Sequence, residues 1–530
     1  MSKGDMMFKR QKSISAFLLV SFIAWSLVLA QERGSGKPSQ AMTLRECIAA
    51  ALANNLDLSI AAYDPAMSEE SISATMEQYL PQFSLSYNKY DQTQPGSWGV
   101  EGQSIRTKND NYSLTLSEKI VTGTIASLSF SNGMTDTSRA YSLVNPAYNS
   151  EFRFNLTQPL LKGFGPKVNR IATLQAENLR DISVSTLKST LLQMIFDIEN
   201  AYWNLYSAIE NMKVQEGSLE ESRTLLKKNR EAVRIGTKSA FDILGSEAEV
   251  AQYEDALVSA RLTVEQGEAL LKKLLNLPAD SPVSGRTLIP ADTPMIEKKD
   301  LAYDEALRIA LDQRPEMTQS AKEIENYGYS ISSYRNELLP RLDLTFSAWS
   351  PGQSGVLYVY DNNNSITGTL INKIQGSRTD ALKQAFKMTY KNWSLRLDFN
   401  LPLANIFTRS SLAKAKMERD QALLKLEREK QSIAYEIADA IKTLENAARR
   451  IESSRVSREL QEKRVAAETQ RYQLGLVGSE WLLSYQRQLT DARTSEIRAL
   501  IDYKLAVAKL EKAMGTTLQT MGLKFRNFAF

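Results

Sequence analysis

The sequence holds few side chains of the kinds that catalyse reactions or bind metals. It contains 61 Asp and Glu residues but no histidine, and its single cysteine is Cys47. Without histidine, Ser-His-Asp and Cys-His nucleophiles are excluded, as are metal sites that use imidazole. Carboxylates could still work as an acid–base pair, but no spacing singles out two of them. We therefore expect no enzyme activity, no cofactor and no metal site.

Cys47 itself is expected to be structural. It lies in the apolar run 47–52, where a small buried side chain is the simplest role. A disulfide within one chain would need a second cysteine. The residue does not follow a signal cleavage site, so it does not resemble a lipidation anchor.

The first 30 residues have the pattern of a secretory signal peptide. A basic start contains Lys3, Lys9, Arg10 and Lys12, an apolar run covers 14–29, and a cleavage site follows at 28–30. The alternative is an uncleaved membrane anchor. No later segment approaches the roughly 18 uncharged residues of a transmembrane helix.

The charge balance argues against a nucleic-acid partner. The net charge of the whole chain is +4. Four basic residues and Asp5 give residues 1–30 a charge of +3, which leaves about +1 for the rest of the chain. No strongly basic face is implied, and such a face is the signature of nucleic-acid binding.

A long segment of the chain occurs twice. Residues 198–277 align with residues 437–516 without a gap, at a shift of 239 positions. Ile198 then matches Ile437, and Gly236 matches Gly475. An unbroken register over about 80 residues indicates a duplicated structural unit.

Each copy is predicted to be a long helical hairpin. Proline is absent from 167–277 and from 403–516. The rising arms, 166–235 and 409–474, would each be about 100 Å long at 1.5 Å per residue. Such a helix needs neighbours along its whole length, so we expect a bundle or a tube. The apolar residues of the first arm recur three or four positions apart: Leu187, Leu191, Met194, Ile198, Tyr202, Leu205, Ile209 and Met212.

The hairpins reverse direction at 234–244 and 473–483. Gly236 and Gly475 are expected to end the rising helices with a positive φ. Ser239 or Ser479 could cap the descending helices. Leu474 and Leu476 would then be exposed apolar side chains at the far end of the molecule, which favours a docking point for a partner helix.

Four segments alternate strictly between apolar and polar residues, as half-buried strands do. They are 83–88 and 152–157 in the first repeat, and 341–348 and 393–401 in the second. The sheet could be an ordinary one with a core on one face. We favour a membrane barrel with its apolar face toward lipid and its polar face toward a water-filled lumen. Arg396 on the lipid side would cost about 2–4 kcal/mol, which fixes the orientation.

Four strands are too few to close a barrel around water, so several copies must contribute to one barrel. The sequence thus predicts an obligate oligomer. The first repeat has extra residues among 112–131, which we interpret as an added hairpin or an extended loop above the barrel. Residues 351–391 are predicted to be a long surface loop.

The chain therefore divides into five parts. They are a signal peptide (1–30), repeat 1 (31–277), a linker (278–300), repeat 2 (301–516) and a C-terminal tail (517–530). Each repeat would hold short helices, barrel strands and a long hairpin in that order. The first short helical element, 43–79, begins with Thr43 and Glu46 at capping-box spacing.

These features together resemble the TolC-like outer-membrane efflux and type I secretion channels over essentially the whole mature length. Individually the matching motifs are weak, but their order, the duplication and the signal peptide make the resemblance specific. The motifs are Leu44 to Leu52, Gln158-Pro159-Leu160, Leu338 to Leu342, and the two glycine-containing tips that end in Asp242-Ile243-Leu244 and Leu482-Leu483.

The resemblance implies a mainly α fold with a membrane β-barrel. Three chains would each supply four strands to a 12-stranded barrel in the outer membrane of a Gram-negative-type envelope. The duplicated hairpins would continue it as an α-barrel tunnel in the periplasm. The homotrimer would contact outer-membrane lipid and dock a periplasmic adaptor coupled to an inner-membrane pump.

The resemblance also gives roles to residues at the tips. Gly236 and the motif Leu474-Gly475-Leu476 would dock the adaptor. Asp242 and Tyr472 match positions of a polar network that closes the entrance. Trp481 stands where a carboxylate is typical and Val477 where an arginine is typical, so an apolar constriction that includes Trp481 is expected instead.

Two functions from different classes remain after this reading. The first is a passive exit duct for efflux or type I secretion. The second is a periplasmic or surface coiled-coil scaffold without a pore. A need for detergent would favour the duct, whereas solubility in plain buffer would favour the scaffold.

Overall fold

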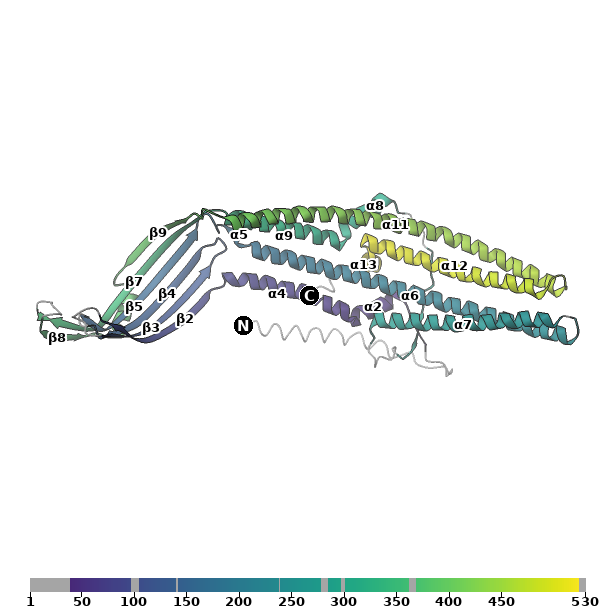
Figure 1. The fold of residues 1–530 in the computed structure, drawn as a ribbon, viewed down its shortest axis with the longest axis horizontal. Helices are drawn as coiled ribbons and strands as arrows, with labels where there is room; N and C mark the ends of the chain where they lie inside the picture. Colours follow the sequence, from purple (N-terminus) through teal and green to yellow (C-terminus); the bar gives the residue numbers. More distant parts are fainter. Residues whose placement is uncertain are drawn as a thin grey trace.

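The computed structural model describes residues 39–96, 104–139, 142–237, 239–277, 285–296, 301–361 and 368–523. The predicted signal peptide at 1–30 lies outside these residues. The molecule is elongated, with a sheet at one end and long helices that run away from it (Figure 1). No helix in the described ranges is both long and apolar enough to cross a membrane.

Two helical hairpins contain the longest elements of the structure, as the duplicated pattern predicts. The first pairs α6 (Ile171–Arg234) with α7 (Ala240–Leu275), and the second pairs α11 (Ile406–Gln473) with α12 (Ser479–Met514). With 64 residues, α6 is about 96 Å long. Since α12 packs on α6, the half of the molecule far from the sheet is a layer of four helices in the order α7, α6, α12, α11 (right-hand side of Figure 1).

Shorter helices complete a layer of the same width near the sheet. They are α2 (Leu44–Asn54), α3 (Leu56–Ala61) and α4 (Tyr63–Met76) in the first half of the chain, and α8 (Tyr303–Gln313) and α9 (Pro315–Glu337) in the second. Next to the sheet, α4 packs on α6, α6 on α9, and α9 on α11. Because α6 and α11 run through both halves, the four-helix layer is continuous along the molecule (Figure 1).

The predicted apolar stripe is the core of the first hairpin. Leu191, Ile198, Tyr202 and Leu205 are fully buried, and their cluster includes Cys47, which is 1% exposed. Burial raises the pKa of the Cys47 thiol to about 12, because the thiolate would lose its hydration there. The expected structural role of Cys47 is therefore confirmed. A second cluster, around Ile433 and Ile437, packs the second hairpin in the same way.

The capping box at the start of α2 is confirmed. The Glu46 backbone N–H donates to Thr43 Oγ1 at 3.3 Å, and the Thr43 N–H donates to Glu46 Oε2 at 2.9 Å. Several short segments lie beside or between the longer elements. β1 (Ser39–Met42) pairs in parallel with β6 (Thr287–Pro290), while α5 (Pro166–Asn169), the 3₁₀ turn Glu77–Tyr79 and α13 (Thr517–Thr520) link or end longer elements.

The sheet contains more strands than the four expected per chain. The four expected strands are β2 (Gln82–Pro95), β5 (Val144–Pro159), β7 (Arg341–Tyr360) and β9 (Asn392–Asn400). Between β2 and β5 lie β3 (Ser104–Lys119) and β4 (Ile125–Thr137), and every neighbouring pair is antiparallel. The extra residues of repeat 1 are thus a hairpin inside the sheet. The row β2-β3-β4-β5-β7-β9 has six strands.

The expected loop at 351–391 is mostly ordered structure. β7 continues to Tyr360, and β8 (Leu370–Gln375) pairs with its upper part, on the edge that β9 uses lower down. Between β8 and β9 the chain leaves the sheet and forms the helix α10 (Arg378–Phe386). The loop prediction was wrong for α10 because this helix is too short and too polar for its sequence to show a helical period.

Candidate functional site

The six-stranded row has one apolar and one polar face. The register places Leu85, Leu114, Phe130 and Phe152 in one cross-strand row, and the rows nearer the long helices on the same face are mostly apolar, with Glu118 as an exception. The opposite face carries mostly short polar side chains. They include Ser84, Ser86, Ser113, Thr115, Ser127, Ser129, Asn155, Thr157, Thr345, Ser347 and Ser394.

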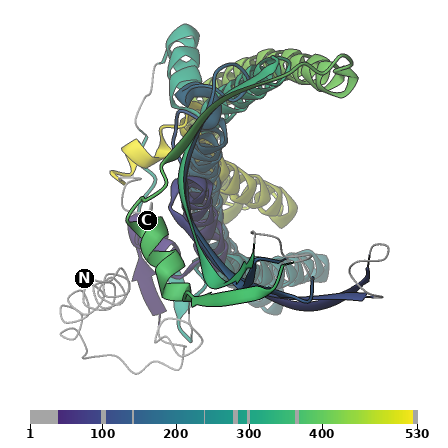
Figure 2. The ribbon, with the colours of Figure 1, turned by 90° about the vertical axis from the view of Figure 1, so that its left-hand side faces the viewer.

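The apolar face is the convex one. The Phe386 ring of α10 stacks on Phe130 at 5.1 Å between centroids and lies 6.0 Å from Phe152, so α10 rests on the apolar face. Viewed along the molecule, the sheet is curved and α10 lies on its outer, convex side (Figure 2). The polar face therefore lines the hollow side of the curve.

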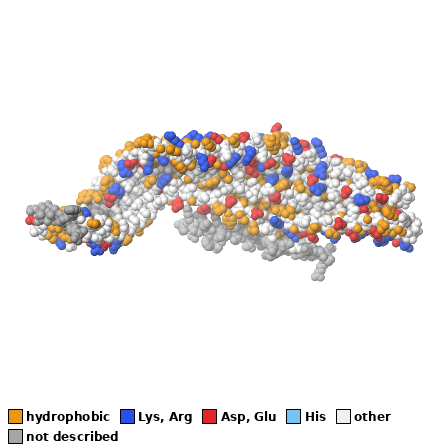
Figure 3. Space-filling view, in the orientation of Figure 1, with side chains coloured by type: hydrophobic (Ala, Val, Ile, Leu, Met, Phe, Trp, Pro, Cys, Tyr) orange, Lys and Arg blue, Asp and Glu red, His pale blue; other side chains and the backbone are white. Residues whose placement is uncertain are grey.

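Between α10 and the long helices, no element of the described structure covers the apolar face. Phe83, Leu395 and Phe399 are between 61% and 68% exposed, and Trp393 is 71% exposed. Hydrophobic side chains also gather where β9 joins α11 (Figure 3), where Leu403 is 94% exposed. A belt of large exposed apolar side chains is unusual for a water-exposed surface and is typical of a surface that contacts lipid or protein.

Two arginines on the polar face, Arg396 and Arg153, form ion pairs with carboxylates on the same face. Arg396 binds Asp398 at 2.8 Å, two residues along β9 and on the same face. Arg153 binds Glu151 at 2.7 Å and lies over the Trp349 ring at 4.8 Å. Arg396 thus points away from the apolar belt, as its expected place on the water-filled side requires.

The far ends of the hairpins form the second candidate site. Gly236 has φ 75° and Gly475 has φ 74°, the left-handed conformation expected of glycines that end helices. The Gly475 N–H donates to the Tyr472 carbonyl at 3.0 Å, and the Leu476 N–H donates to the Arg471 carbonyl at 3.0 Å. Beside Gly475, Leu474 is 75% exposed and Leu476 is 66% exposed.

The first tip also exposes apolar side chains that the sequence analysis did not select. Ile235 is 65% exposed and Phe241 is 76% exposed. The internal repeat held the signal for Ile235, because the shift of 239 positions matches it to Leu474. Both tips therefore present apolar side chains next to a helix-ending glycine.

A polar network joins the two hairpins just above the tips. Asp242 Oδ1 accepts a 2.5 Å hydrogen bond from Ser479 Oγ. The Tyr472 hydroxyl donates to Asn229 Oδ1, and Asn229 Nδ2 donates to Ser246 Oγ at 2.7 Å. Ser246 Oγ then donates to the Asp242 carbonyl at 3.0 Å, which closes the path.

The network explains why Ser479 does not cap a helix. The N-cap of α12 is Gly478, and Ser479 is buried with its hydroxyl on the other hairpin. Ser239, by contrast, caps α7, since its Oγ accepts from the Phe241 N–H at 3.2 Å. Burial raises the pKa of the Tyr472 hydroxyl and the charge of Asp242 raises it further, so Tyr472 is a neutral donor at neutral pH.

The three residues assigned to the constriction do not form one group. Asp242 and Tyr472 belong to the network, but among the described residues no hydrogen bond joins Trp481 to it. Trp481 is 61% exposed, and its ring lies 6.3 Å from the Tyr485 ring. The Arg464 guanidinium lies over the Tyr485 ring, 4.1 Å from its centroid.

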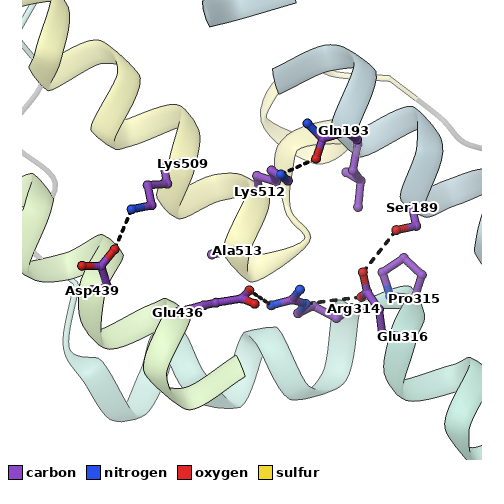
Figure 4. A pocket seen from close by; sticks show the side chains of 11 residues that line it. Ser189, Gln193, Arg314, Pro315, Glu316, Glu436, Asp439, Lys509, Lys512 and Ala513 are labelled. Carbon is purple, nitrogen blue, oxygen red and sulfur yellow. Dashed lines mark hydrogen bonds and ion pairs between the residues drawn. The ribbon is translucent and has the colours of Figure 1, made fainter. Parts of the chain in front are cut away.

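A charged pocket joins the two repeats halfway along the molecule (Figure 4). Arg314 is the central residue, with ion pairs to Glu436 at 2.5 Å and Glu316 at 3.3 Å. Burial alone would lower the pKa of Arg314, but these two carboxylates raise it above its usual value. Ser189 Oγ donates to Glu316 at 3.2 Å. These charged groups pair with one another, and the contacts hold α6 against α9 and α11.

The described residues contain no group of three His, Cys, Asp or Glu side chains placed to hold a metal ion. The two candidate sites are surfaces. The sheet has a polar concave face and an apolar convex belt, and the hairpin tips present apolar side chains next to a polar network.

Comparison with known proteins gives a family match over most of the chain. The family model described as outer membrane efflux protein matches residues 47–277 and 306–516. Among curated proteins, no sequence matches this one.

Solved structures share the fold at low sequence identity. The CmeC outer membrane channel of Campylobacter jejuni has a TM-score of 0.64 and 16% identity, covering 93% of this chain and 90% of that chain. The outer membrane protein VceC of Vibrio cholerae has a TM-score of 0.63 and 15% identity, covering 89% and 96%. The MtrE outer membrane channel of Neisseria gonorrhoeae, in its open state, has a TM-score of 0.60 and 19% identity, covering 93% and 96%.

Proposed function

Since the chain belongs to the outer membrane efflux protein family, we propose that it is the outer-membrane subunit of an export system and forms a passive exit duct. The sheet end lies in the outer membrane and the helical end extends into the periplasm. Cargo enters between the hairpin tips and leaves through the barrel. The pump that supplies the energy is a different protein, so the same duct serves efflux or type I secretion.

The observation that carries this proposal is the two-faced sheet. Its convex face is apolar and, apart from the part under α10, uncovered in the described structure, while its concave face carries Ser, Thr and Asn side chains. Lipid on one side and water on the other satisfy this pattern without any further protein layer. The scaffold alternative would leave the belt around Phe83, Leu395 and Phe399 in water.

Closure of the barrel requires neighbouring copies of the chain. β2 and β9 are the two edges of the six-stranded row, and both are exposed along their length. An edge left open in a membrane has unsatisfied backbone N–H and C=O groups. Pairing β9 of one copy with β2 of the next removes both open edges of the six-stranded row, and neighbouring strands remain antiparallel.

Three copies then give eighteen strands instead of twelve. The widths of the two layers support this number. Four helices side by side span about 32–40 Å at interaxial distances of about 8–10 Å. Six strands tilted by about 40° span about 38 Å, whereas four strands would span only about 25 Å. The barrel therefore continues the tunnel wall without narrowing, and the narrowest point of the duct is at the tips.

The tips dock the periplasmic adaptor. Leu474 and Leu476 on one hairpin and Ile235 on the other present apolar side chains beside Gly475 and Gly236. An adaptor helix that packs between them would bury these side chains. The network of Asp242 and Tyr472 holds the two hairpins together until docking separates them.

The test is conductance together with assembly. The purified protein is expected to require detergent, to migrate as a heat-modifiable trimer, and to conduct ions across a planar bilayer after Asp242→Ala opens the tips. A protein that stays soluble in plain buffer and never conducts, even with this substitution, would support the scaffold and overturn the duct.

A further inference from the structure

The helix α10 gives the convex side of the sheet a feature that the export duct does not explain. It leaves the sheet between β8 and β9 and rests on the outer face of the sheet. A simple barrel strand would have continued from β8 to β9 along the edge of β7, so the excursion must have its own reason.

The helix is held firmly against the sheet. Ala381 and Ala385 are fully buried, and they face Gly352 of β7. A Cβ on Gly352 would lie 2.1 Å from the Ala381 carbonyl oxygen, so only glycine allows this approach. At the start of the helix, Arg378 forms a 2.8 Å ion pair with Asp110 of β3.

The register places α10 at the upper border of the apolar belt. Its last residue, Phe386, contacts Phe130 and Phe152, which lie in one cross-strand row. The next row, farther from the long helices, mixes tyrosines with polar or small residues: Tyr87, Tyr112, Asn132, Ser150 and Gly352. α10 lies over this mixed zone, so its position corresponds to the headgroup layer above the lipid tails.

The outward side of this segment combines aromatic and basic residues. Phe386 is 60% exposed and Tyr390 is 56% exposed, and Met388 lies between them. Lys383, Lys387 and Lys391 recur every four residues and are also exposed. Lys383 has only a 4.0 Å contact with Asp380, and the described residues show no ion pair for Lys387 or Lys391.

We propose that α10 and the turn after it form a lipid-headgroup site, in which Lys383, Lys387 and Lys391 bind phosphate groups of outer-leaflet lipids while Phe386, Met388 and Tyr390 insert beside the acyl chains. The inference rests on the proposed barrel in the outer membrane. Clustered lysines next to an apolar anchor are the pattern that binds anionic lipid surfaces. The rings at Phe386 and Tyr390 match the place of an aromatic girdle.

The occupant follows from charge and continuity. Segment 377–391 carries Arg378 and three lysines against one carboxylate, Asp380, and Arg378 is already paired with Asp110. The free positive charge therefore belongs to the three lysines. Phe386, within the same segment as the lysines, contacts Phe130 and Phe152 of the apolar face, so the anion that reaches the lysines is attached to lipid.

The experiment uses the full-length trimer in nanodiscs of phosphatidylcholine, with or without phosphorylated lipid A. Lipid A retained around the protein is measured by mass spectrometry for wild type and for the triple variant K383Q/K387Q/K391Q. The triple variant is expected to retain at least about tenfold less lipid A, with phosphatidylcholine retention unchanged. A matched control, K227Q/K228Q/K273Q, removes the same charge from the exposed helical arms and should behave as wild type.

Conductance of the same preparations separates the two proposals. If the triple variant conducts normally but retains as much lipid A as wild type, or if the control variant loses as much, the headgroup site is wrong and the duct stands. If the trimers bind lipid A in a lysine-dependent way but never conduct, even when they carry Asp242→Ala, the duct is wrong instead. Replacing Phe386 and Tyr390 by serine should release lipid of both kinds, which distinguishes anchoring from phosphate binding.

Discussion

Ser479 Oγ donates a 2.5 Å hydrogen bond to Asp242 Oδ1, although the two residues are 237 positions apart. The bond connects the first turn of α12 with the first turn of α7, and so connects the two hairpins at their tips. Both residues come from one chain. The tips are therefore joined within each subunit before any neighbour is considered.

The first prediction concerns this bond. Asp242→Ala removes a charged hydrogen-bond acceptor, a contact that contributes about 1.5–3 kcal/mol. The tips should then separate more readily. The fraction of open channels, measured as bilayer conductance, should rise by about tenfold or more. Glu254→Gln is the control, because its 2.6 Å ion pair with Arg223 lies within one hairpin. Equal conductance of both variants and wild type would show that the bond does not restrain the entrance.

The second prediction concerns the exposed tip. Leu474→Asp with Leu476→Asp should abolish export in cells that depend on this chain, measured as growth with a toxic exported compound. Trimer formation and bilayer conductance should not change, since both side chains are mostly exposed in the chain. The matched pair Leu474→Met and Leu476→Met keeps the tip apolar and should export normally. Normal export by the aspartate variant would exclude docking at this tip.

The third prediction concerns the edges of the sheet. Ser86→Cys on β2 and Ser394→Cys on β9 or a neighbouring β9 position should form disulfides between subunits, seen as trimers on denaturing gels. Native Cys47 is 1% exposed and will not compete. The pair Ser129→Cys and Ser394→Cys places one cysteine on the inner strand β4, and it should not cross-link. Cross-linking of this control pair would mean that β4 forms an edge of the assembled sheet.

The fourth prediction concerns pH. Glu249 is 5% exposed, and burial raises the pKa of its carboxyl above 4.5, although Arg487, with its nitrogen 3.6 Å away, opposes the shift. A raised folded-state pKa means that the charged carboxylate disfavours folding above that pKa. Below the unfolded value of about 4.5 both states are protonated, and the penalty disappears.

Glu249→Gln should therefore raise the unfolding temperature by about 2 °C at neutral pH and have little effect below pH 4.5. The measurement is thermal unfolding followed by circular dichroism at several pH values. The control is Glu247→Gln, on the same helix as Glu249. It removes an exposed carboxylate that pairs with Arg230 of α6. A larger gain at acid pH than at neutral pH would contradict the assigned shift.

The sequence was a reliable guide where structure depends on local spacing. The apolar recurrence from Leu187 to Met212 predicted the first long helix, and the cap at Thr43 and the turn at Gly475 followed from residue type alone. These features depend on neighbours within one or two helical turns. Alternation likewise predicted which side chains share a face, as Leu395 and Arg396 show.

What the sequence by itself determined was a duplicated chain with long hairpins and two-faced strands. Only the tertiary structure decided that β3 and β4 lie between β2 and β5, that Ser479 binds Asp242 rather than capping α12, and that 378–386 is a helix on the sheet. Strand order and the choice of a hydroxyl's partner depend on which distant backbone comes within hydrogen-bonding distance. A periodic pattern sets the face of each residue but contains no information about that neighbour.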